Sequence, residues 1–303
     1  MQRISYTSSI LLIVFLFSGC NSFKKGWSDM NLFPLSYDVD LGKQLAGDIQ
    51  SKPDEFPILD PIKNKKVYAY IDQIVQKILH SGNIKNVKNF EWNVKIIRDD
   101  KTLNAFAAPG GYIYLYTGLI LFLDSENELA GVLGHEMAHA DQRHSTKQLT
   151  KNLGVQLLLN VVLNSASKNQ KANETIGNIT SALVGLKFSR THESEADNYS
   201  VQYLCPTAYK ADGAAGFFKK MYDQPTPPQW LSTHPNSKNR VEMITKASEQ
   251  LGCKGTQRYQ KPYEEIKDLI RRSAGNPSGK SVLTKKKNGT KKQPGKVIMP
   301  KRN

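Results

Sequence analysis

Two histidines four residues apart, His135 and His139, constrain this chain more than any other feature of its sequence. They follow a Ser-x-x-Glu capping box, Ser125 and Glu128, and an apolar stripe at helical spacing, so they lie inside a predicted helix. Residues four apart share one face of a helix, where two imidazoles can bind one zinc ion. Glu136 stands beside the first histidine and can take a proton from a water molecule at the metal. The pattern therefore predicts one catalytic zinc ion per chain.

A second predicted helix carries candidates for a further ligand. Glu193 and Asp197 are four residues apart and share a face, whereas Glu195 points elsewhere. A catalytic zinc needs three protein ligands, and a ligating histidine usually has a hydrogen-bond partner on its other ring nitrogen. We therefore expect one of the two carboxylates to bind the metal and the other to hold a histidine. His192 and Glu195 are expected on a solvent-facing side of this helix.

Periodic apolar residues predict that most of the chain is helical. The predicted helices cover residues 38–49, 67–79, 125–139, 155–163, 179–203, 214–221 and 237–251. The apolar run 155–163 is too short to cross a membrane, so we expect a buried or membrane-facing helix there. The polar residues 164–178 predict a loop, and we expect order to fade after residue 251 towards residue 271.

Between the helices the pattern changes to that of a small sheet. Residues 92–97 alternate between apolar and polar side chains, as in a half-buried strand. Residues 105–108 and 112–116 flank Pro109-Gly110-Gly111, which is typical of two strands joined by a tight turn. The expected fold class is therefore α+β, mainly helical, with a small sheet between helices.

The N-terminus has the pattern of an export signal. Its apolar run, residues 10–17, is too short to span a bilayer core of roughly 30 Å. Ser18-Gly19 before Cys20 resembles the bacterial lipobox, in which the cysteine is lipidated and becomes the first mature residue. A lipidated Cys20 would attach the chain to a membrane by acyl chains, and Asn21 after it resembles the outer-membrane sorting preference of Gram-negative lipoproteins. An ordinary cleaved signal peptide is the alternative, and both interpretations export the protein.

Export also bears on the two cysteines that remain after processing. An oxidising envelope would permit Cys205 and Cys253 to form a disulfide. Two free thiols in small apolar settings are the alternative. The sequence leaves this choice open.

The charge of the chain is concentrated at its C-terminal end. The 303 residues contain 42 Lys and Arg against 27 Asp and Glu, a net charge of +15. Residues 271–303 hold eleven of the basic residues and no acidic ones, which leaves +4 for the rest. We expect no nucleic-acid partner, because a charge of +4 is too small for a nucleic-acid surface over the whole fold and no aromatic residue in the tail could stack on bases. The composition of this tail predicts a disordered, solvated terminus. Contact of the tail with anionic lipid or polymer is the alternative.

Four blocks of the sequence, taken in order, resemble one known family. The blocks are Asn104–Ile113, His135–His139 followed by Gln142-Arg143-His144, Ser189–Asp197, and Ser232–Pro235 followed by Arg240. They resemble zinc metallopeptidases of the HtpX, Oma and CAAX-protease type, family forty-eight of the metallopeptidases, and within it the periplasmic BepA and LoiP branch. The resemblance covers residues 37–251, and the tetratricopeptide repeats of BepA-like proteins have no counterpart after them.

The resemblance implies a zincin-like fold and specific roles for the residues of these blocks. It implies that His135, His139 and Glu193 bind zinc and that Glu136 is the catalytic base. Asp197 would support the site, often as a proton donor. His234 would lie near the metal, either as an oxyanion stabiliser or as a resting-state ligand, although the residues alone also allow a purely structural histidine. An edge strand lining the cleft would pair with extended substrate backbone through Asn104, Ala105, Phe106 and Ala107.

The function that the resemblance implies is a zinc endopeptidase that cleaves misfolded or misassembled envelope proteins. A latent zinc-bound chaperone or binding module is the alternative, and Glu136 favours the enzyme because a binding module needs no base beside the metal. A tail-driven binder of anionic polymer is a third hypothesis. The expected domains are a signal peptide (1–19), lipidated Cys20 with a tether (20–36), the metallopeptidase domain (37–253), and a basic extension (254–303) disordered from residue 271.

Overall fold

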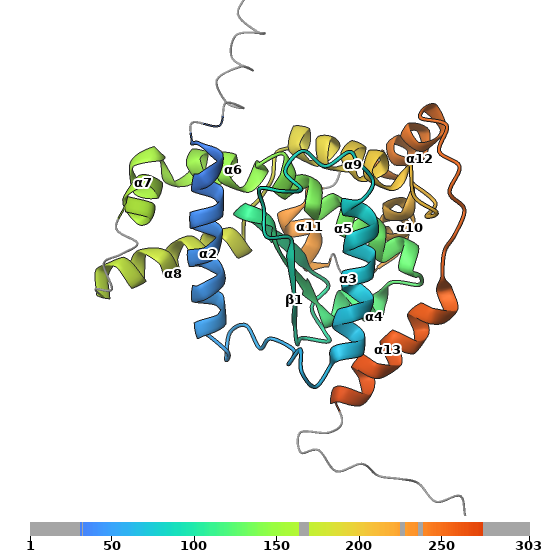
Figure 1. Ribbon diagram of the computed structural model, residues 1–303, viewed down its shortest axis with the longest axis horizontal. Helices are drawn as coiled ribbons and strands as arrows, with labels where there is room; N and C mark the ends of the chain where they lie inside the picture. The colour runs from blue at the N-terminus through green and yellow to red at the C-terminus, as the bar shows by residue number, and fades with distance from the viewer. Residues whose placement is uncertain (1–30, 32, 164–169, 225–227, 236–238, 275–303) are drawn as a thin grey trace, which may run out of the picture.

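The computed structural model describes residues 31, 33–163, 170–224, 228–235 and 239–274. The predicted export signal, Cys20 and the basic tail from residue 275 lie outside these ranges. Within them, helices surround a small sheet (Figure 1), which confirms the mainly helical α+β fold predicted from the sequence.

Helices make up most of the described chain. Their bounds in chain order are α2 (Leu35–Ser51), α3 (Lys65–Leu79), α4 (Thr117–Phe122), α5 (Glu126–Asp141), α6 (His144–Leu153), α7 (Val155–Leu163), α8 (Gln170–Val184), α9 (Arg190–Leu204), α10 (Gly213–Tyr222), α11 (Gln229–Thr233), α12 (Arg240–Gln250) and α13 (Gln260–Ala274). Each predicted helix has a counterpart among them. Within the described ranges, none of these helices has the length and hydropathy needed to cross a lipid bilayer.

The sheet has three strands in the order β1-β3-β2, namely β1 (Asn93–Ile97), β3 (Tyr112–Tyr116) and β2 (Ala105–Ala108). β1 runs parallel to β3, and β2 runs antiparallel to β3, to which the Pro-Gly-Gly turn joins it. Gly110 and Gly111 have φ angles of 75° and 88°, and a Cβ on either would lie 2.9 Å from another part of the backbone. The predicted strands and turn are confirmed, with β2 at an edge of the sheet.

Side chains alternate between the two faces of the sheet along each strand, and each face packs against its own apolar core. Ile113 and Leu115 of β3 join the larger apolar core, which includes α3, α5, α10 and α13. Tyr114 and Tyr116 join a second core with α2, α7 and α8. In Figure 1, α2 stands on one side of the sheet and α3, α4 and α5 stand on the other.

Helix α5, which carries His135 and His139, is buried along its whole length. Ser125 caps it by accepting a hydrogen bond from the Glu128 backbone N–H, as the capping box predicts. A Cβ on Gly131 would lie 2.2 Å from the backbone of Ala214 on α10. The Ser200 hydroxyl of α9 donates to the Gly131 carbonyl at 2.9 Å. The small residues of α5 therefore let α9 and α10 approach it closely, which brings the acidic face of α9 towards the two histidines.

Two predictions about the helices are wrong. The expected loop over residues 164–178 is helical from Gln170, because Ile179 and Leu183 of α8 pack into the core next to α2. The expected single helix 179–203 is broken between Val184 and Arg190. Ser189 begins α9 by accepting a hydrogen bond from the His192 backbone N–H at 3.1 Å.

The chain also stays ordered beyond residue 251, contrary to the expectation. Helix α13 continues to Ala274, so the first residues of the segment predicted to be disordered are helical. Tyr263, Ile266 and Ile270 recur at helical spacing and are buried in the larger core, which is why the helix forms. Before it, Cys205 and Cys253 are joined in a disulfide that links the end of α9 to the chain after α12.

Candidate metal centre

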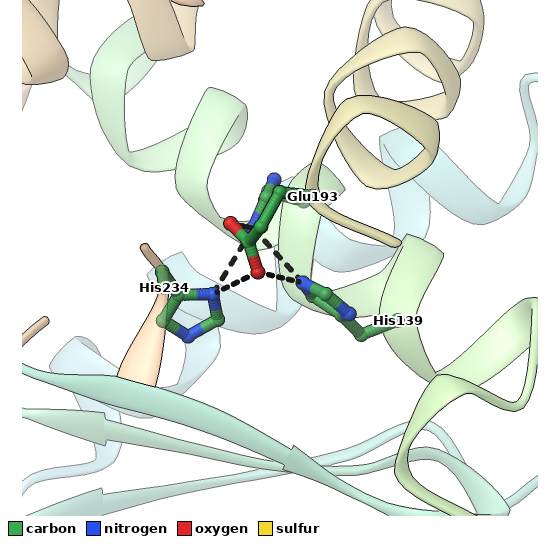
Figure 2. A group of neighbouring side chains, drawn as sticks. His139, Glu193 and His234 are labelled. Carbon is green, nitrogen blue, oxygen red and sulfur yellow. Dashed lines mark hydrogen bonds and ion pairs between the residues drawn. The ribbon is translucent and has the colours of Figure 1, made fainter. Parts of the chain in front are cut away.

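Four buried side chains from three parts of the fold meet at one point. α5 carries His135 and His139, α9 carries Glu193, and His234 follows α11. One ligand atom of each lies within 4.8 Å of the others. Figure 2 shows His139, Glu193 and His234 turned toward one another. The structure thus brings the three predicted zinc ligands and His234 into one cluster.

The distances between these atoms fit a metal ion. His135 Nε2 lies 3.0 Å from His139 Nε2 and 3.3 Å from His234 Nδ1. Glu193 Oε1 lies 3.1 Å from His234 Nδ1 and 3.4 Å from His139 Nε2. Ligands about 2.0–2.1 Å from a tetrahedral zinc are about 3.3 Å from one another, and imidazole and carboxylate are donors that zinc prefers. The residues therefore fit one zinc ion, which would act as a Lewis acid toward a peptide carbonyl and a water molecule.

Glu136 lies on α5 beside this cluster and is fully buried. Its Oε1 is 3.7 Å from His234 Nε2, and neither carboxylate oxygen has a hydrogen-bond partner among the described residues. Burial raises the pKa of Glu136, although the nearby charges of His234 and His135 oppose the rise. A carboxylate with a raised pKa and free lone pairs is suited to accept a proton.

The ring nitrogen of His135 that points away from the cluster contacts a carboxylate. His135 Nδ1 lies 2.9 Å from Asp197 Oδ1. Arg240, itself buried, donates to Asp197 from Nε and Nη2 at 2.7 Å each, and its Nη1 lies 2.9 Å from Glu193 Oε2. Burial alone would raise the pKa of Asp197, but Arg240 and His135 hold it below its ordinary value. Asp197 is therefore ionised and accepts a hydrogen bond from His135.

The Nδ1 atom of His139, which also points away from the cluster, contacts a histidine and not a carboxylate. His139 Nδ1 lies 3.0 Å from His144 Nδ1, and His144 Nε2 lies 3.2 Å from Glu195 Oε2. On its other side the His139 ring stacks on Phe188, with centroids 3.9 Å and planes 24° apart. His144 therefore contacts His139 on the side away from the cluster and is itself bonded to Glu195, as Asp197 contacts His135 and is bonded to Arg240.

The protonation states of the ligands differ in the metal-free site. Burial alone would lower the pKa of His135, but hydrogen bonds to Asp197 and Glu193 raise it to about 9. Burial lowers the pKa of His139 well below its ordinary value. Burial alone would raise the pKa of Glu193, but the three surrounding histidines hold it well below its ordinary value. A metal ion entering the site would have to displace a proton from His135.

Two features of the site were not predicted from the sequence. The prediction for His192 is wrong: its side chain is 4% exposed because His144, at the start of α6, covers it, with ring centroids 4.4 Å apart. Arg240 belongs to one of the four sequence blocks that resemble the family, but no role was predicted for it. Nothing in the residues around it indicates a buried carboxylate partner. Glu195 does face away from the cluster, and its side chain is 37% exposed.

The predicted substrate strand lies next to the site. The residues of β2 are buried, and so is Asn104, whose side-chain amide has no hydrogen-bond partner among the described residues. The Leu103 carbonyl just before it accepts a hydrogen bond from the Trp230 backbone N–H at 3.0 Å. That bond holds α11, and with it His234, against the start of the edge strand.

Comparison with known proteins identifies the family. A model of peptidase family M48 matches residues 65–248, which is more than half of the chain and includes all four clustered residues. The chain belongs to this family. The resemblance drawn from the four sequence blocks is confirmed.

Several curated proteins are similar to this chain. The mitochondrial metalloendopeptidase OMA1 of Danio rerio is 32% identical over 193 residues, which cover 58% of this chain and 40% of that protein. The beta-barrel assembly-enhancing protease of Yersinia pestis is 28% identical over 195 residues, 61% of this chain and 38% of the relative. The protein of the same name in Escherichia coli is 27% identical over 192 residues, 59% and 38%. The chain spans about two fifths of the length of these relatives.

Proposed function

We propose that this protein is a zinc-dependent endopeptidase that hydrolyses misfolded or misassembled proteins of the bacterial cell envelope. The observation that carries the proposal is Glu136, a buried carboxylate without a hydrogen-bond partner among the described residues, beside a cluster with zinc-ligand spacing. Membership of a peptidase family supports the reaction class. Relatives named beta-barrel assembly-enhancing protease support the envelope as the place of action.

In this proposal each residue of the site has one task. His135, His139 and Glu193 hold the zinc ion, and Glu136 accepts the proton of the attacking water and passes it to the leaving amine. Asp197 accepts a hydrogen bond from the Nδ1–H of His135 and so keeps Nε2 of His135 facing the metal. Because Arg240 keeps Asp197 ionised, Asp197 acts in this way rather than as a proton donor.

The edge strand would hold the substrate. Asn104, Ala105, Phe106 and Ala107 belong to a short segment at the sheet edge, next to the helix that positions His234. An extended peptide could pair with this edge and bring its carbonyl to the metal. The buried amide of Asn104 offers a donor and an acceptor to such a peptide.

The proposed location follows from the termini. We propose that residues 1–19 direct export, that lipidated Cys20 and a tether (20–36) attach the protein to the outer membrane facing the periplasm, and that residues 37–253 form the peptidase domain. The extension 254–303 contributes α13 to the fold and ends in the basic tail. Cell fractionation of a Cys20→Ser variant tests the anchor, which should be released from the membrane or stall in processing.

A second candidate, a latent zinc-bound chaperone or binding module, is favoured by one observation. His234 Nδ1 lies among the other ligand atoms, so four protein ligands could occupy all the tetrahedral positions. A catalytic zinc needs one position open to water or substrate. The two candidates therefore differ in whether His234 leaves the metal.

The deciding experiment is a proteolysis assay on an unfolded protein with measured zinc content. Glu136→Gln should retain zinc and lose hydrolysis, because the ligands remain and the proton acceptor is gone. Glu249→Gln, on the exposed side of α12, is the matched control and should match the wild type. A Glu136→Gln protein that keeps most of its activity contradicts the proposal. If the wild type binds unfolded protein without cleaving it and His234→Ala restores cleavage, the latent candidate is correct for the resting protein.

A further inference from the structure

We propose that His144 and Glu195 are positioning residues for the metal ligand His139, acting as a two-step hydrogen-bond relay that ends at the protein surface. The inference rests on the proposed function in that it needs a metal ion at His139. It assigns a task to two residues that the sequence left without one.

The geometry of the relay is continuous. His139 Nε2 faces the other ligand atoms, 3.0 Å from His135 Nε2 and 3.4 Å from Glu193 Oε1. Its Nδ1 lies 3.0 Å from His144 Nδ1, and His144 Nε2 lies 3.2 Å from Glu195 Oε2. Each step has the length of a hydrogen bond, and together they join the cluster to a carboxylate that is 37% exposed.

The hydrogen atoms of the relay from His139 to Glu195 have only one self-consistent arrangement. If His139 binds a metal through Nε2, its proton is on Nδ1 and must be donated to His144 Nδ1. His144 Nδ1 then accepts, so the proton of His144 is on Nε2, where it is donated to Glu195 Oε2. Any other assignment sets two N–H groups or two lone pairs against each other. Glu195 thus selects the tautomer of His144, and His144 selects the tautomer of His139.

The position of His144 is held by a stacked ring and by the anchored turn that precedes it. Its side chain is buried, and its ring stacks on that of His192 with centroids 4.4 Å and planes 13° apart. The preceding residue, Arg143, has a φ of 61° and makes an ion pair with buried Asp38 of α2, to which it donates from Nε at 2.9 Å. Thr146 also donates to Asp38. The left-handed turn between α5 and α6 is therefore anchored to α2, which places the His144 ring behind His139.

Two substitutions of His144 separate positioning from packing. Asn keeps an acceptor near the place of Nδ1 but leaves a smaller side chain, whereas Phe keeps the ring and its stacking but cannot accept a hydrogen bond. We expect His144→Phe to weaken zinc binding about 10–100-fold and His144→Asn to stay closer to the wild type. A residue needed only for packing would give the opposite order, because a ring would replace a ring.

The readouts do not depend on hydrolysis. Zinc dissociation constants come from competition with a chelator, and the visible spectrum of the cobalt-substituted protein reports the ligand field of His139. Thermal melting of the metal-free variants shows whether each has folded. The proposal is overturned if folded His144→Phe binds zinc as tightly as the wild type, or if His144→Asn loses as much affinity as His144→Phe.

Glu195 provides a second test on a partly exposed residue, where a substitution should disturb the fold less than at buried His144. Glu195→Gln keeps an acceptor for His144 and should bind zinc like the wild type, whereas Glu195→Ala should lose up to about tenfold, less than a partner bonded directly to a ligand. Glu249→Ala is the exposed control. Equal affinity in Glu195→Ala and Glu249→Ala overturns the outer step, and a wild type that binds no zinc overturns the relay itself. If only the Glu136→Gln assay fails, the proposed reaction is wrong and the relay stands.

Discussion

His135 and His139 lie one turn apart on α5 and face the same cluster, yet the groups behind them differ. Behind His135 is a carboxylate, Asp197, closed off by the buried cation of Arg240. Behind His139 is a second imidazole, His144, which reaches a partly exposed carboxylate, Glu195. One side of the site is a buried network of charges, and the other is a hydrogen-bonded path to the surface.

The difference shows how a fold can support two ligands without burying more charge than it can neutralise. Asp197 and Glu193 already share the guanidinium of Arg240, so the charge of this side chain is divided between two buried carboxylates. A third buried carboxylate behind His139 would need a further cation, because unpaired charges in the interior are costly. A neutral imidazole passes the hydrogen bond outward and leaves the charge of Glu195 near water. The same contrast accounts for the opposite pKa shifts of the two histidines, upward for His135 and downward for His139.

The largest effect is expected from Arg240→Met, which tests whether the His135 side is a charge network. Removing the cation leaves Asp197 and Glu193 buried without it, so the free energy of unfolding of the metal-free protein should fall by about 3–5 kcal/mol. Arg271→Met is the control, since the pair of Arg271 with Asp268 is half exposed and is worth at most about 1 kcal/mol. Chemical denaturation measures both. If both variants lose a similar amount of unfolding free energy, the side of the site behind His135 is not a buried charge network.

A smaller effect is expected from Asp197→Asn, which keeps an acceptor for His135 but removes the charge. Zinc affinity should fall about 10–100-fold, more than for Glu195→Ala on the other side. Chelator competition on both variants gives the comparison, with the exposed Asp54→Asn as the control. If Glu195→Ala does the greater damage, then the surface path, and not the buried network, is the stronger support.

The smallest effect is the pH dependence of zinc binding, which separates the two histidines. His135, with its pKa raised to about 9, carries a proton below that pH, and His139, with its pKa lowered, does not. Between pH 7 and 8.5 the zinc affinity should therefore rise about tenfold per pH unit and level off near pH 9. The measurement belongs in the Glu136→Gln background, because that carboxyl also has a raised pKa. A slope near a hundredfold per unit would mean that His139 is protonated too.

Most of the fold follows from local patterns in the sequence. The capping box at Ser125, the stripe over residues 67–79 and the Pro-Gly-Gly turn each depend on neighbours within a few residues, and each has the predicted structure. α13 was missed although Tyr263, Ile266 and Ile270 form a stripe of the same kind. The residues around that stripe are mostly charged, so the composition of the segment is that of a solvated one.

The site likewise has one part that follows from local sequence patterns and another that depends on the packing of the helices. The spacing of His135 and His139, and of Glu193 and Asp197, decides which pairs share a helix face, because helical geometry is local. Which side of α9 is buried depends on what covers it, and only the tertiary structure decided that. His144 meets Glu195 across 51 residues, Arg240 meets Asp197 across 43, and Arg143 meets Asp38 across 105. Contacts at such separations depend on how helices pack against each other. The sequence by itself therefore determined the metal-binding helix, and the folded chain determined which groups support each of its histidines.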